Sequence, residues 1–294
     1  MTIIDAILYG QKKLTSAGIK SPRLDSELIL CHVLKTTRTS LYINHKATLN
    51  QIQQKNYKKL LKFRCKHVPV AYIIRKKEFY GLEFFIRQGI LIPRPETELL
   101  VEKTLEVIKN KDDPCVADLC CGCGSIAVAV AYYNKSVNVF ASDLSKLAVS
   151  VAAKNVIRHK VENRVFLMCG DLWRPFDAKN IKGFDVVVSN PPYIPSRELK
   201  NLKQDVKREP ILALDGGNDG LDFYRKIINE TGKFLKTSGS IILEIGWDQA
   251  VKIHGMLKDA GFSDIQVIKD YAGFDRVVSA VWNNRTSKEA KNDG

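Results

Sequence analysis

Three aspartates stand near the ends of three consecutive predicted strands, and the first precedes a glycine-containing turn. Asp118 lies within the first strand, while Asp143 and Asp171 end the next two. The turn after Asp118 reads Cys120-Cys121-Gly122-Cys123-Gly124, and its glycines let the backbone approach a ligand closely. In a sheet of parallel strands, ligands bind at the edge where such turns gather. The spacing therefore predicts a small-molecule site around this turn.

The three carboxylates indicate which small molecule this site would hold. The negative charge of Asp118 would favour an ammonium or a hydroxyl group. The turn is not a typical dinucleotide site, because Ser-Ile-Ala follows Gly124 and the Gly-x-Gly-x-x-Gly pattern is missing. Asp143, at the end of the next strand, can accept hydrogen bonds from two ribose hydroxyls. Asp171 could bind an exocyclic amine. Together the three carboxylates predict a site for a positively charged nucleoside, and S-adenosylmethionine is such a molecule. Each aspartate alone could instead cap the N-terminus of a helix.

The segment Asn190-Pro191-Pro192-Tyr193 follows the fourth predicted strand and combines residues that can hold a planar amino group. Each proline restricts the residue before it to extended backbone, so the chain cannot turn straight into a helix. The Asn190 side-chain carbonyl and the Pro191 main-chain carbonyl can then both accept hydrogen bonds. Two acceptors match the two N–H donors of an amide or a nucleobase amine.

Such a site would assist a poor nucleophile, because the lone pair of an amide or nucleobase nitrogen is delocalised. Holding both hydrogens orients the nitrogen toward the methyl donor and stabilises the positive charge that grows on it. Tyr193 would pack against the flat group and exclude water. We therefore predict Asn190, Pro191 and Tyr193 as catalytic residues, and Pro192 with them as substrate-binding. A double-proline loop without chemistry is the alternative.

Strands alternate with helices from residue 114 onward, and these elements must position the candidate residues. The pattern predicts strands over 115–119, 137–143, 164–171, 185–190 and 240–246. It predicts helices over 125–133, 145–159, 221–235 and 249–260. Two further strands, IQVIKD and DRVVSAVW, are expected to form a terminal hairpin. This alternation predicts a parallel sheet covered by helices on both faces.

The first third of the chain has a different character. Residues 1–68 carry apolar side chains at helical spacing, with a helix start at Ser21-Pro22, and predict a small helical bundle. Glu78–Ile86 is typical of a β-hairpin around Tyr80-Gly81. Residues 1–90 hold 17 Lys and Arg against 5 Asp and Glu, whereas the other 204 hold 29 against 27. This excess suggests a separate domain with an anionic partner; a solvated basic helix face is the alternative.

Composition excludes several classes of protein. With 45% hydrophobic and 27% charged residues, the 294-residue chain is not disordered as a whole, and no apolar run approaches the roughly 20 residues of a membrane span. The N-terminal residues are typical of an amphipathic helix and not of a signal peptide. Seven cysteines without a regular framework favour reduced thiols in the cytoplasm. Cys120-x-x-Cys123 lacks a second pair of zinc ligands, so we expect no metal.

Several segments carry a resemblance to a known family. Asn190–Tyr193 resembles the signature of class I amino-methyltransferases, and Pro93-Arg94-Pro95-Glu96-Thr97-Glu98 resembles a segment of the bacterial peptide chain release factor glutamine methyltransferases. The other similar segments are Glu209-Pro210, 213–217, 219–221, Tyr224-Arg225, 243–246 and 273–277. The resemblance covers essentially the whole chain.

The resemblance implies an α/β fold, with a Rossmann-like class I methyltransferase sheet, a small N-terminal helical domain and a linking β-hairpin. We expect an N-terminal helical substrate-docking domain over 1–75 and the hairpin and linker over 76–100. The S-adenosylmethionine-dependent methyltransferase domain would span 101–285, followed by a disordered tail over 286–294. We expect a cytoplasmic monomer.

The resemblance also implies a reaction: N-methylation of the glutamine side-chain amide in the Gly-Gly-Gln motif of class I peptide chain release factors, with S-adenosyl-L-methionine as donor. Residues 120–124, Asp143, Leu172 and Asn190 would bind the cofactor, and residues 190–193 would hold the glutamine. Glu96 and Thr97 would line the donor pocket. The N-terminal domain would hold the release factor at a surface distant from the chemistry.

One departure from the family and two other functions stay open. The family loop usually has glycine where this chain has Cys120, which would be strained if the position needs positive φ. A DNA or RNA adenine methyltransferase would use a similar Asn-Pro-Pro-Tyr loop on a flipped base. Against it, the 101 residues after Tyr193 complete the sheet and leave no separate target-recognition region, so we expect no stable nucleic acid complex. The third possibility is a protein that binds a translation factor but has lost catalysis. Its only support is the replacement of the usual loop glycine by Cys120.

Overall fold

The computed structural model describes residues 1–283, and the chain divides into two compact units. The first unit comprises Met1–Lys77, Ile86–Gln88 and Leu202–Glu209. The second comprises Glu78–Phe85, Gly89–Asn201 and the chain from Pro210 onward. The tail that we predicted to be disordered, 286–294, lies outside the described residues.

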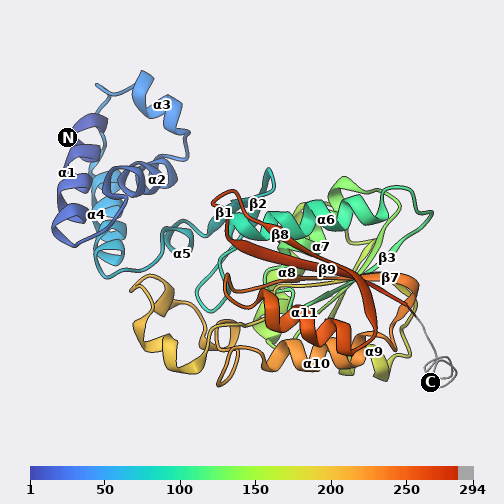
Figure 1. The fold of residues 1–294 in the computed structure, drawn as a ribbon. Helices are drawn as coiled ribbons and strands as arrows, with labels where there is room; N and C mark the ends of the chain where they lie inside the picture. Colours follow the sequence, from blue (N-terminus) through green and yellow to red (C-terminus); the bar gives the residue numbers. More distant parts are fainter. Residues whose placement is uncertain (284–294) are drawn as a thin grey trace, which may run out of the picture. The chain divides into compact units, whose positions relative to one another are not determined.

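The first unit is the helical bundle that the apolar spacing predicted. Its helices are α1 (Ile3–Ser16), α2 (Pro22–Leu34), α3 (Arg38–Ile43), α4 (Gln51–Cys65) and α5 (Val70–Ile74) (Figure 1). Helix α2 begins at Pro22, as predicted. Thr2 and Asn50 cap α1 and α4 with reciprocal side-chain and backbone hydrogen bonds, which satisfy donors that a helix start otherwise leaves unpaired.

The core of this unit closes around a buried tyrosine of α4. The Tyr57 hydroxyl donates to the Ala6 carbonyl at 3.0 Å and lies 2.7 Å from the Ser26 hydroxyl, so that one side chain joins α1, α2 and α4. Apolar side chains from these helices and from α3 share its core: Ile3, Ile7, Leu14, Ile29, Leu30, Leu41 and Leu61.

A distant segment belongs to this unit. Residues 202–209, with the short helix η3 (Val206–Arg208), are tied to the bundle by Arg64. Its buried guanidinium donates to Asp25 at 2.6 Å and to Asp205 at 2.7 Å. Charge-assisted hydrogen bonds on both sides compensate the burial of the guanidinium. The sequence pattern gave no sign of this connection.

The predicted hairpin is confirmed. Strands β1 (Lys76–Phe79) and β2 (Leu82–Phe85) form a two-stranded sheet. The turn residues Tyr80 and Gly81 have φ of 50° and 70°, the positive values of a two-residue hairpin turn that matches the twist of its strands.

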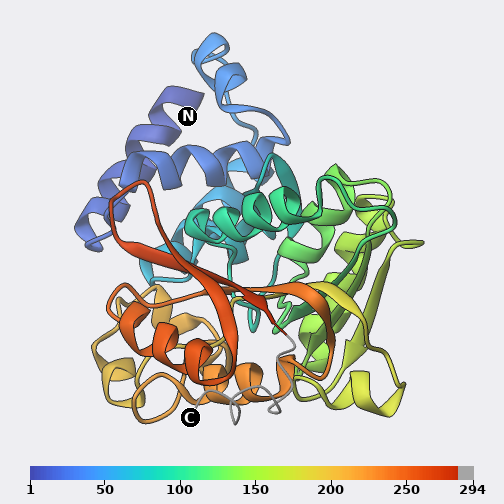
Figure 2. The same ribbon diagram turned by 45° about the vertical axis from the view of Figure 1, so that its right-hand side comes forward.

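The second unit contains a seven-stranded sheet in the order β5-β4-β3-β6-β7-β9-β8. All neighbouring strands are parallel up to β7, and β8 and β9 form the terminal antiparallel hairpin that we predicted. Figure 2 shows this hairpin in red. The strands are β3 (Cys115–Leu119), β4 (Asn138–Asp143), β5 (Val165–Cys169), β6 (Phe184–Ser189), β7 (Leu235–Glu244), β8 (Phe262–Lys269) and β9 (Asp275–Trp282).

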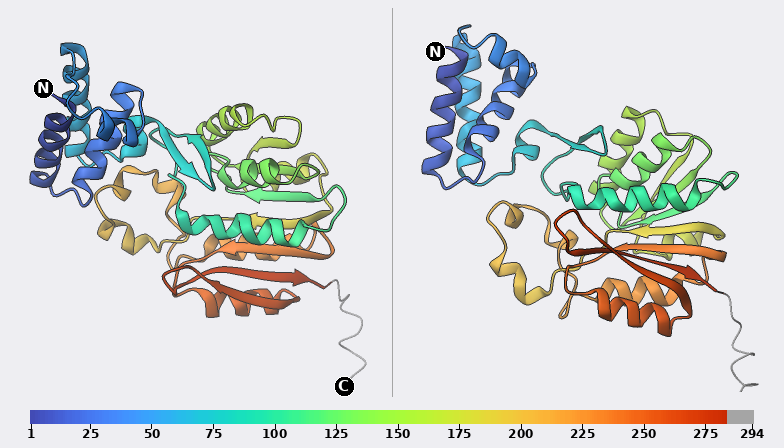
Figure 3. Two further views of the ribbon diagram at one scale, coloured as in Figure 1. Left: turned by 90° about the horizontal axis from the view of Figure 1, so that it is seen from above. Right: turned by 45° about the horizontal axis from the view of Figure 1, so that its top comes forward.

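Helices cover both faces of this sheet, as the alternation predicted. One face carries α6 (Glu98–Ile108), α7 (Ser125–Tyr133) and α8 (Lys146–Arg158), and the other carries α10 (Asp222–Thr231) and α11 (Ala250–Asp259) (Figure 3). Shorter helical turns lie in the connections: η1 (Pro95–Thr97), α9 (Arg174–Ala178), η2 (Ser196–Asn201) and η4 (Ile211–Ala213). This arrangement is the class I methyltransferase fold that we expected.

The predicted boundaries between α10 and β7 are wrong, and β8 begins at Phe262, three residues before the predicted start of its strand. The helix expected over 221–235 ends at Thr231, and β7 begins at Leu235, five residues before the predicted strand start. The cause is Phe234, which leaves the helical path and stacks on Trp173 with ring centroids 4.2 Å apart. Burial of this aromatic pair outweighs the continuation of the helix.

No helix within residues 1–283 combines the length and the apolar character needed to cross a bilayer.

Candidate active site

The strand register brings the predicted site residues to one edge of the sheet. Leu119 at the end of β3 is paired with Ser142 of β4 and with Ser189 of β6, and Asp143 is paired with Cys169 of β5. The strand order reverses between β3 and β6, which is where ligands bind in sheets of this kind. The turn after β3 and the segment after β6 are therefore neighbours.

A cavity of about 730 Å³, including its open mouth, lies at this edge and has the size of a small-molecule site. The predicted residues that line it are Cys120, Gly122, Asp143, Asp171, Leu172, Asn190 and Pro192. Other predicted site residues are not among those lining it: Asp118, Cys121, Cys123, Gly124, Pro191 and Tyr193. The structure thus gathers residues from the ends of four strands, β3, β4, β5 and β6, around one cavity.

Apolar side chains that our sequence analysis did not assign complete the walls. They are Ile90, Leu91, Leu144, Leu212, Ala213 and Phe223. Such walls suit a flat nucleobase, and the few polar groups among them would set its orientation. Glu96 and Thr97, which the resemblance placed in the donor pocket, are not among the lining residues.

Asp143 is held in place by two backbone donors. Its Oδ2 accepts from Gly122 N and its Oδ1 from Ser145 N, each at 2.8 Å. Burial raises the pKa of this carboxyl, while the two backbone hydrogen bonds lower it. Each carboxylate oxygen keeps further acceptor capacity, so the group can still take hydroxyl donors from the cavity.

The turn after β3 settles the question that Cys120 raised. Cys120 has a φ of 61°, in the left-handed region where a side chain clashes with its own backbone. Glycine, which the resemblance leads one to expect at this position, would be unstrained there. Cys120 therefore stores strain of about 1 kcal/mol or more beside the cavity.

Replacing Cys120 by glycine is expected to leave S-adenosylmethionine affinity unchanged or raise it up to about fivefold, and to change the free energy of unfolding by less than about 1 kcal/mol. Relief of strain offsets the lost side-chain packing and the greater freedom of the unfolded chain. Calorimetric titration and denaturant unfolding measure both. Cys123→Gly is the matched control, because buried Cys123 has no positive φ and should be destabilised. A tenfold or larger loss of affinity in Cys120→Gly would contradict this account.

Asp118 lies beneath the turn, fully buried. Its Oδ2 accepts from Ala127 N at 3.1 Å, in the first turn of α7, whereas its Oδ1 has no hydrogen-bond partner among the described residues. Burial raises the pKa of Asp118 to about 8 against the effect of that hydrogen bond. The carboxyl therefore favours its neutral form at neutral pH, and its predicted contact with a donor stays a prediction.

The segment after β6 is anchored through its first residue. Asn190 Nδ2 donates to Thr97 Oγ1 at 3.1 Å, and the Thr97 hydroxyl in turn donates to Glu244 Oε2 at 2.6 Å. The described residues offer no donor to Asn190 Oδ1. The side-chain carbonyl that we expected to accept from a substrate is therefore unoccupied by the protein.

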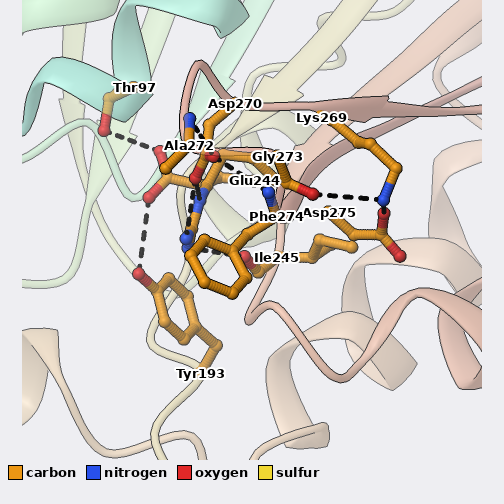
Figure 4. A network of polar contacts seen from close by, with 11 residues as sticks. Thr97, Tyr193, Glu244, Ile245, Lys269, Asp270, Ala272, Gly273, Phe274 and Asp275 are labelled. Atoms are coloured by element: carbon orange, nitrogen blue, oxygen red, sulfur yellow. Dashed lines mark hydrogen bonds and ion pairs between the residues drawn. The ribbon is translucent and has the colours of Figure 1, made fainter.

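Tyr193 at the other end of the segment contacts the same carboxylate. Its hydroxyl lies 3.5 Å from Glu244 Oε1, a long hydrogen bond, and its main-chain carbonyl accepts from Gln249 Nε2 at 3.0 Å. Figure 4 shows Thr97 and Tyr193 approaching Glu244. Burial raises the pKa of Tyr193, so its hydroxyl is protonated and can donate at neutral pH.

The glycine-rich segment 215–220 has a structural purpose beside Tyr193. A Cβ on Gly216 would lie 2.7 Å from Tyr193 Cα, and one on Gly220 would lie 2.4 Å from the Tyr193 carbonyl oxygen. Only glycine permits this close approach. Ile194 N donates to the Leu214 carbonyl at 2.9 Å and joins the two segments.

Glu244, Gln249 and Arg276 belong to the site but received no role from the sequence. Glu244 closes β7, which reads as a buried apolar strand, and a charged residue at its end was the available signal. Gln249 caps the start of α11 and Arg276 is the second residue of β9, and polar residues are common at the ends of helices and strands.

The described residues contain no group of three His, Cys, Asp or Glu side chains that could hold a metal ion, and all seven cysteines are free. Cys121 and Cys123 are buried, and burial raises the pKa of both thiols, with the nearby acidic groups adding to the shift at Cys121. They are therefore held as inert thiols that pack the turn.

The fold, the cavity at the strand reversal and the Asn-Pro-Pro-Tyr segment beside it define a class I methyltransferase. A crystal structure of a methyltransferase from Pyrococcus furiosus shares the fold, with a TM-score of 0.52 and 17% identity over 78% of this chain and 99% of that chain. Two family models match: the PrmC N-terminal domain over residues 5–74 and the methyltransferase small domain over residues 95–213.

Full-length relatives identify the family. The release factor glutamine methyltransferase of Clostridium acetobutylicum is 42% identical and covers 96% of this chain and 99% of its own length. The protein of the same name from Clostridium botulinum is 38% identical over 95% of this chain and 99% of its own length. The chain belongs to the release factor glutamine methyltransferase family.

Proposed function

We propose that this protein transfers a methyl group from S-adenosyl-L-methionine to the side-chain amide nitrogen of the glutamine in the Gly-Gly-Gln motif of class I peptide chain release factors. The observation that carries the proposal is the direction of the Asn190 amide. Its nitrogen is engaged by Thr97, so its oxygen is left as an acceptor beside the cavity. Membership of the family supports this choice of substrate.

The cavity residues fit the donor. S-adenosylmethionine supplies a methyl group on a positively charged sulfur. Asp143 would accept from the ribose hydroxyls while its backbone hydrogen bonds keep the carboxylate in place. Asp171 would bind the exocyclic amine of the adenine, and Leu172 would pack against its ring. The cavity has both acidic side chains and apolar walls, as a cationic nucleoside requires.

Asn190 and Pro191 would hold the acceptor amide. Asn190 Oδ1 and the Pro191 carbonyl each accept one N–H, which fixes the nitrogen in the direction of the donor. Both oxygens stabilise the positive charge that develops on the nitrogen during attack. The methylated amide then loses a proton to water without help from a strong base, because a protonated amide is very acidic.

Transfer of labelled methyl to purified substrates tests the proposal. The substrates are a class I release factor, the same factor with its Gly-Gly-Gln glutamine replaced by alanine, and duplex DNA. We expect label on the unaltered factor alone. Label on DNA would instead assign the protein to the adenine methyltransferases. Failure to bind the donor would favour a protein without catalysis.

We further propose that the N-terminal helical unit docks the release factor. Exposed lysines repeat at helical spacing along one side of α4, at Lys55, Lys59 and Lys62, and Lys66 caps the end of the helix. The exposed Phe63 lies among them. A basic and partly apolar surface fits an acidic protein surface. We place the activity in the cytoplasm, where translation occurs, and propose a monomer that forms no stable complex with nucleic acid.

Reversing two of these charges, in Lys59→Glu with Lys62→Glu, is expected to raise KM for the intact release factor about tenfold and to leave KM for a short Gly-Gly-Gln peptide unchanged. The reason is that only the intact factor would reach α4, and added salt should reduce the difference. Steady-state kinetics with both substrates measure the effect. Lys252→Glu with Lys258→Glu, exposed on α11, is the matched control. Equal changes for factor and peptide would argue against docking by α4.

A further inference from the structure

One buried carboxylate is linked to both ends of the Asn190–Tyr193 segment, directly to Tyr193 and through Thr97 to Asn190. Glu244 Oε2 accepts from Thr97, whose hydroxyl accepts from Asn190, and Glu244 Oε1 lies 3.5 Å from the Tyr193 hydroxyl. Figure 4 shows Thr97 and Tyr193 contacting Glu244 from two sides. The side chain is fully buried, with the residue 1% exposed, and lies at the end of β7 next to β6.

The chain of hydrogen bonds has a defined direction. A threonine hydroxyl has one hydrogen, and Thr97 gives it to Glu244 at 2.6 Å. Its lone pairs can then only accept, so the group that Asn190 presents must be its NH₂. An ionised Glu244 is an acceptor only, and it therefore determines that the Asn190 oxygen turns away from Thr97. Glu244 thus determines, through Thr97, that Asn190 presents its oxygen and not its NH₂ group to the substrate.

Other groups contact Glu244 through its main chain or by their charge. The Tyr224 hydroxyl donates to the Glu244 main-chain carbonyl at 2.8 Å. Arg276 on β9 lies close enough for its charge to favour the ionised carboxylate, and is itself bound to the Ile245 carbonyl at 3.2 Å and to Asp270 at 3.1 Å.

We propose, on the basis of the proposed function, that Glu244 and Thr97 are positioning residues that orient the Asn190 amide for the substrate, with ionised Glu244 as the working form. Neither residue touches the substrate in this account. Their contribution is to exclude the flipped amide, which would offer N–H donors to a substrate that itself brings donors. A flipped Asn190 would therefore repel the glutamine amide and leave it unoriented.

The charge state of Glu244 adds a pH dependence. The pKa of Glu244 is raised to about 7, mainly by burial and further by the negative charge of Glu96. The hydrogen bond from Thr97 and the positive charge of Arg276 lower the pKa but do not cancel this effect. Below this pH a proton on Oε2 would be donated to Thr97, which would then donate to Asn190 and favour the flipped amide. Turnover should therefore fall about tenfold from pH 8 to pH 6.

Two substitutions at Thr97 test the positioning role. Thr97→Val keeps the shape and removes the hydroxyl, and kcat is expected to fall about 10–100-fold with donor affinity unchanged. Thr97→Ser keeps the hydroxyl and should retain kcat within about threefold of wild type. The proposal would be overturned if Thr97→Val were folded and as active as Thr97→Ser. It would also be overturned if kcat fell equally in the two variants.

Glu244→Gln tests the polarity, because the glutamine can offer Thr97 either an acceptor or a donor. We expect lower kcat and loss of the decline between pH 8 and pH 6. A second readout does not need catalysis: the Asn190 side-chain N–H resonances, identified by their loss in Asn190→Ala, should shift in Thr97→Val and titrate near pH 7 in wild type only. If the factor is not methylated at all, the proposed function fails, whereas unchanged resonances would overturn the positioning role by itself.

Discussion

Replacing Asn190 by alanine is expected to lower kcat for methyl transfer to the release factor by about 10²–10³-fold while the protein stays folded. The substitution removes one of two acceptors that would hold the glutamine amide and stabilise its developing charge, and loss of one such group typically costs this much. Fold stability should change little, because within residues 1–283 the side chain is hydrogen-bonded only to the Thr97 hydroxyl, which keeps its bond to Glu244. Single-turnover kinetics at saturating donor measure the effect.

The control for this experiment is Asn229→Ala, which alters an exposed asparagine of α10. Its kcat should equal that of wild type. Far-ultraviolet circular dichroism and thermal unfolding of both variants would show that the chains are folded. A rate for Asn190→Ala within about threefold of wild type would remove Asn190 from the reacting site.

Replacing Asp143 by alanine is expected to weaken S-adenosylmethionine binding about 100-fold and to change kcat at saturating donor much less. Two charge-assisted hydrogen bonds to ribose hydroxyls would be lost, each worth about 1.5–3 kcal/mol before compensation by water. The donor would still reach the same reacting geometry once bound. Calorimetric titration gives the affinity directly.

Asp143 also holds Gly122 and Ser145, so loss of affinity alone does not separate a ribose contact from support of the turn. A 2′-deoxy analogue of S-adenosylhomocysteine separates them. The analogue should bind the wild type more weakly than S-adenosylhomocysteine does, whereas Asp143→Ala should bind the two equally. An identical preference in both proteins would contradict the ribose contact.

The sheet could be predicted from sequence because its central strands, β3 and β6, are buried on both faces. The run of β6 is short, rich in valine and bounded by turns, which favours a buried strand over a buried helix. The loops at the carboxyl ends of these strands then had to meet at one edge, which placed Asp143, Asp171 and Asn190 around one cavity. The hydrophobic pattern of the strands and their parallel order are therefore sufficient to predict where the cavity lies.

The contacts that orient the site could not be predicted in the same way. Thr97 and Glu244 are 147 residues apart, and neither segment carries a local signal of the other. The conformation of Cys120 was equally hidden, since its left-handed φ follows from how the turn leaves β3 for α7. Long-range hydrogen bonds and the backbone strain of a turn depend on tertiary packing, which single-sequence patterns do not encode.

The most direct test of the central claim is to locate the transferred methyl group. The release factor would be incubated with this protein and S-adenosylmethionine carrying a deuterated methyl group, then digested and sequenced by tandem mass spectrometry. We predict the mass of one labelled methyl group on the glutamine side chain of the Gly-Gly-Gln motif and on no other residue. Label on a different residue, or no label on the factor while the donor is bound, would contradict the account.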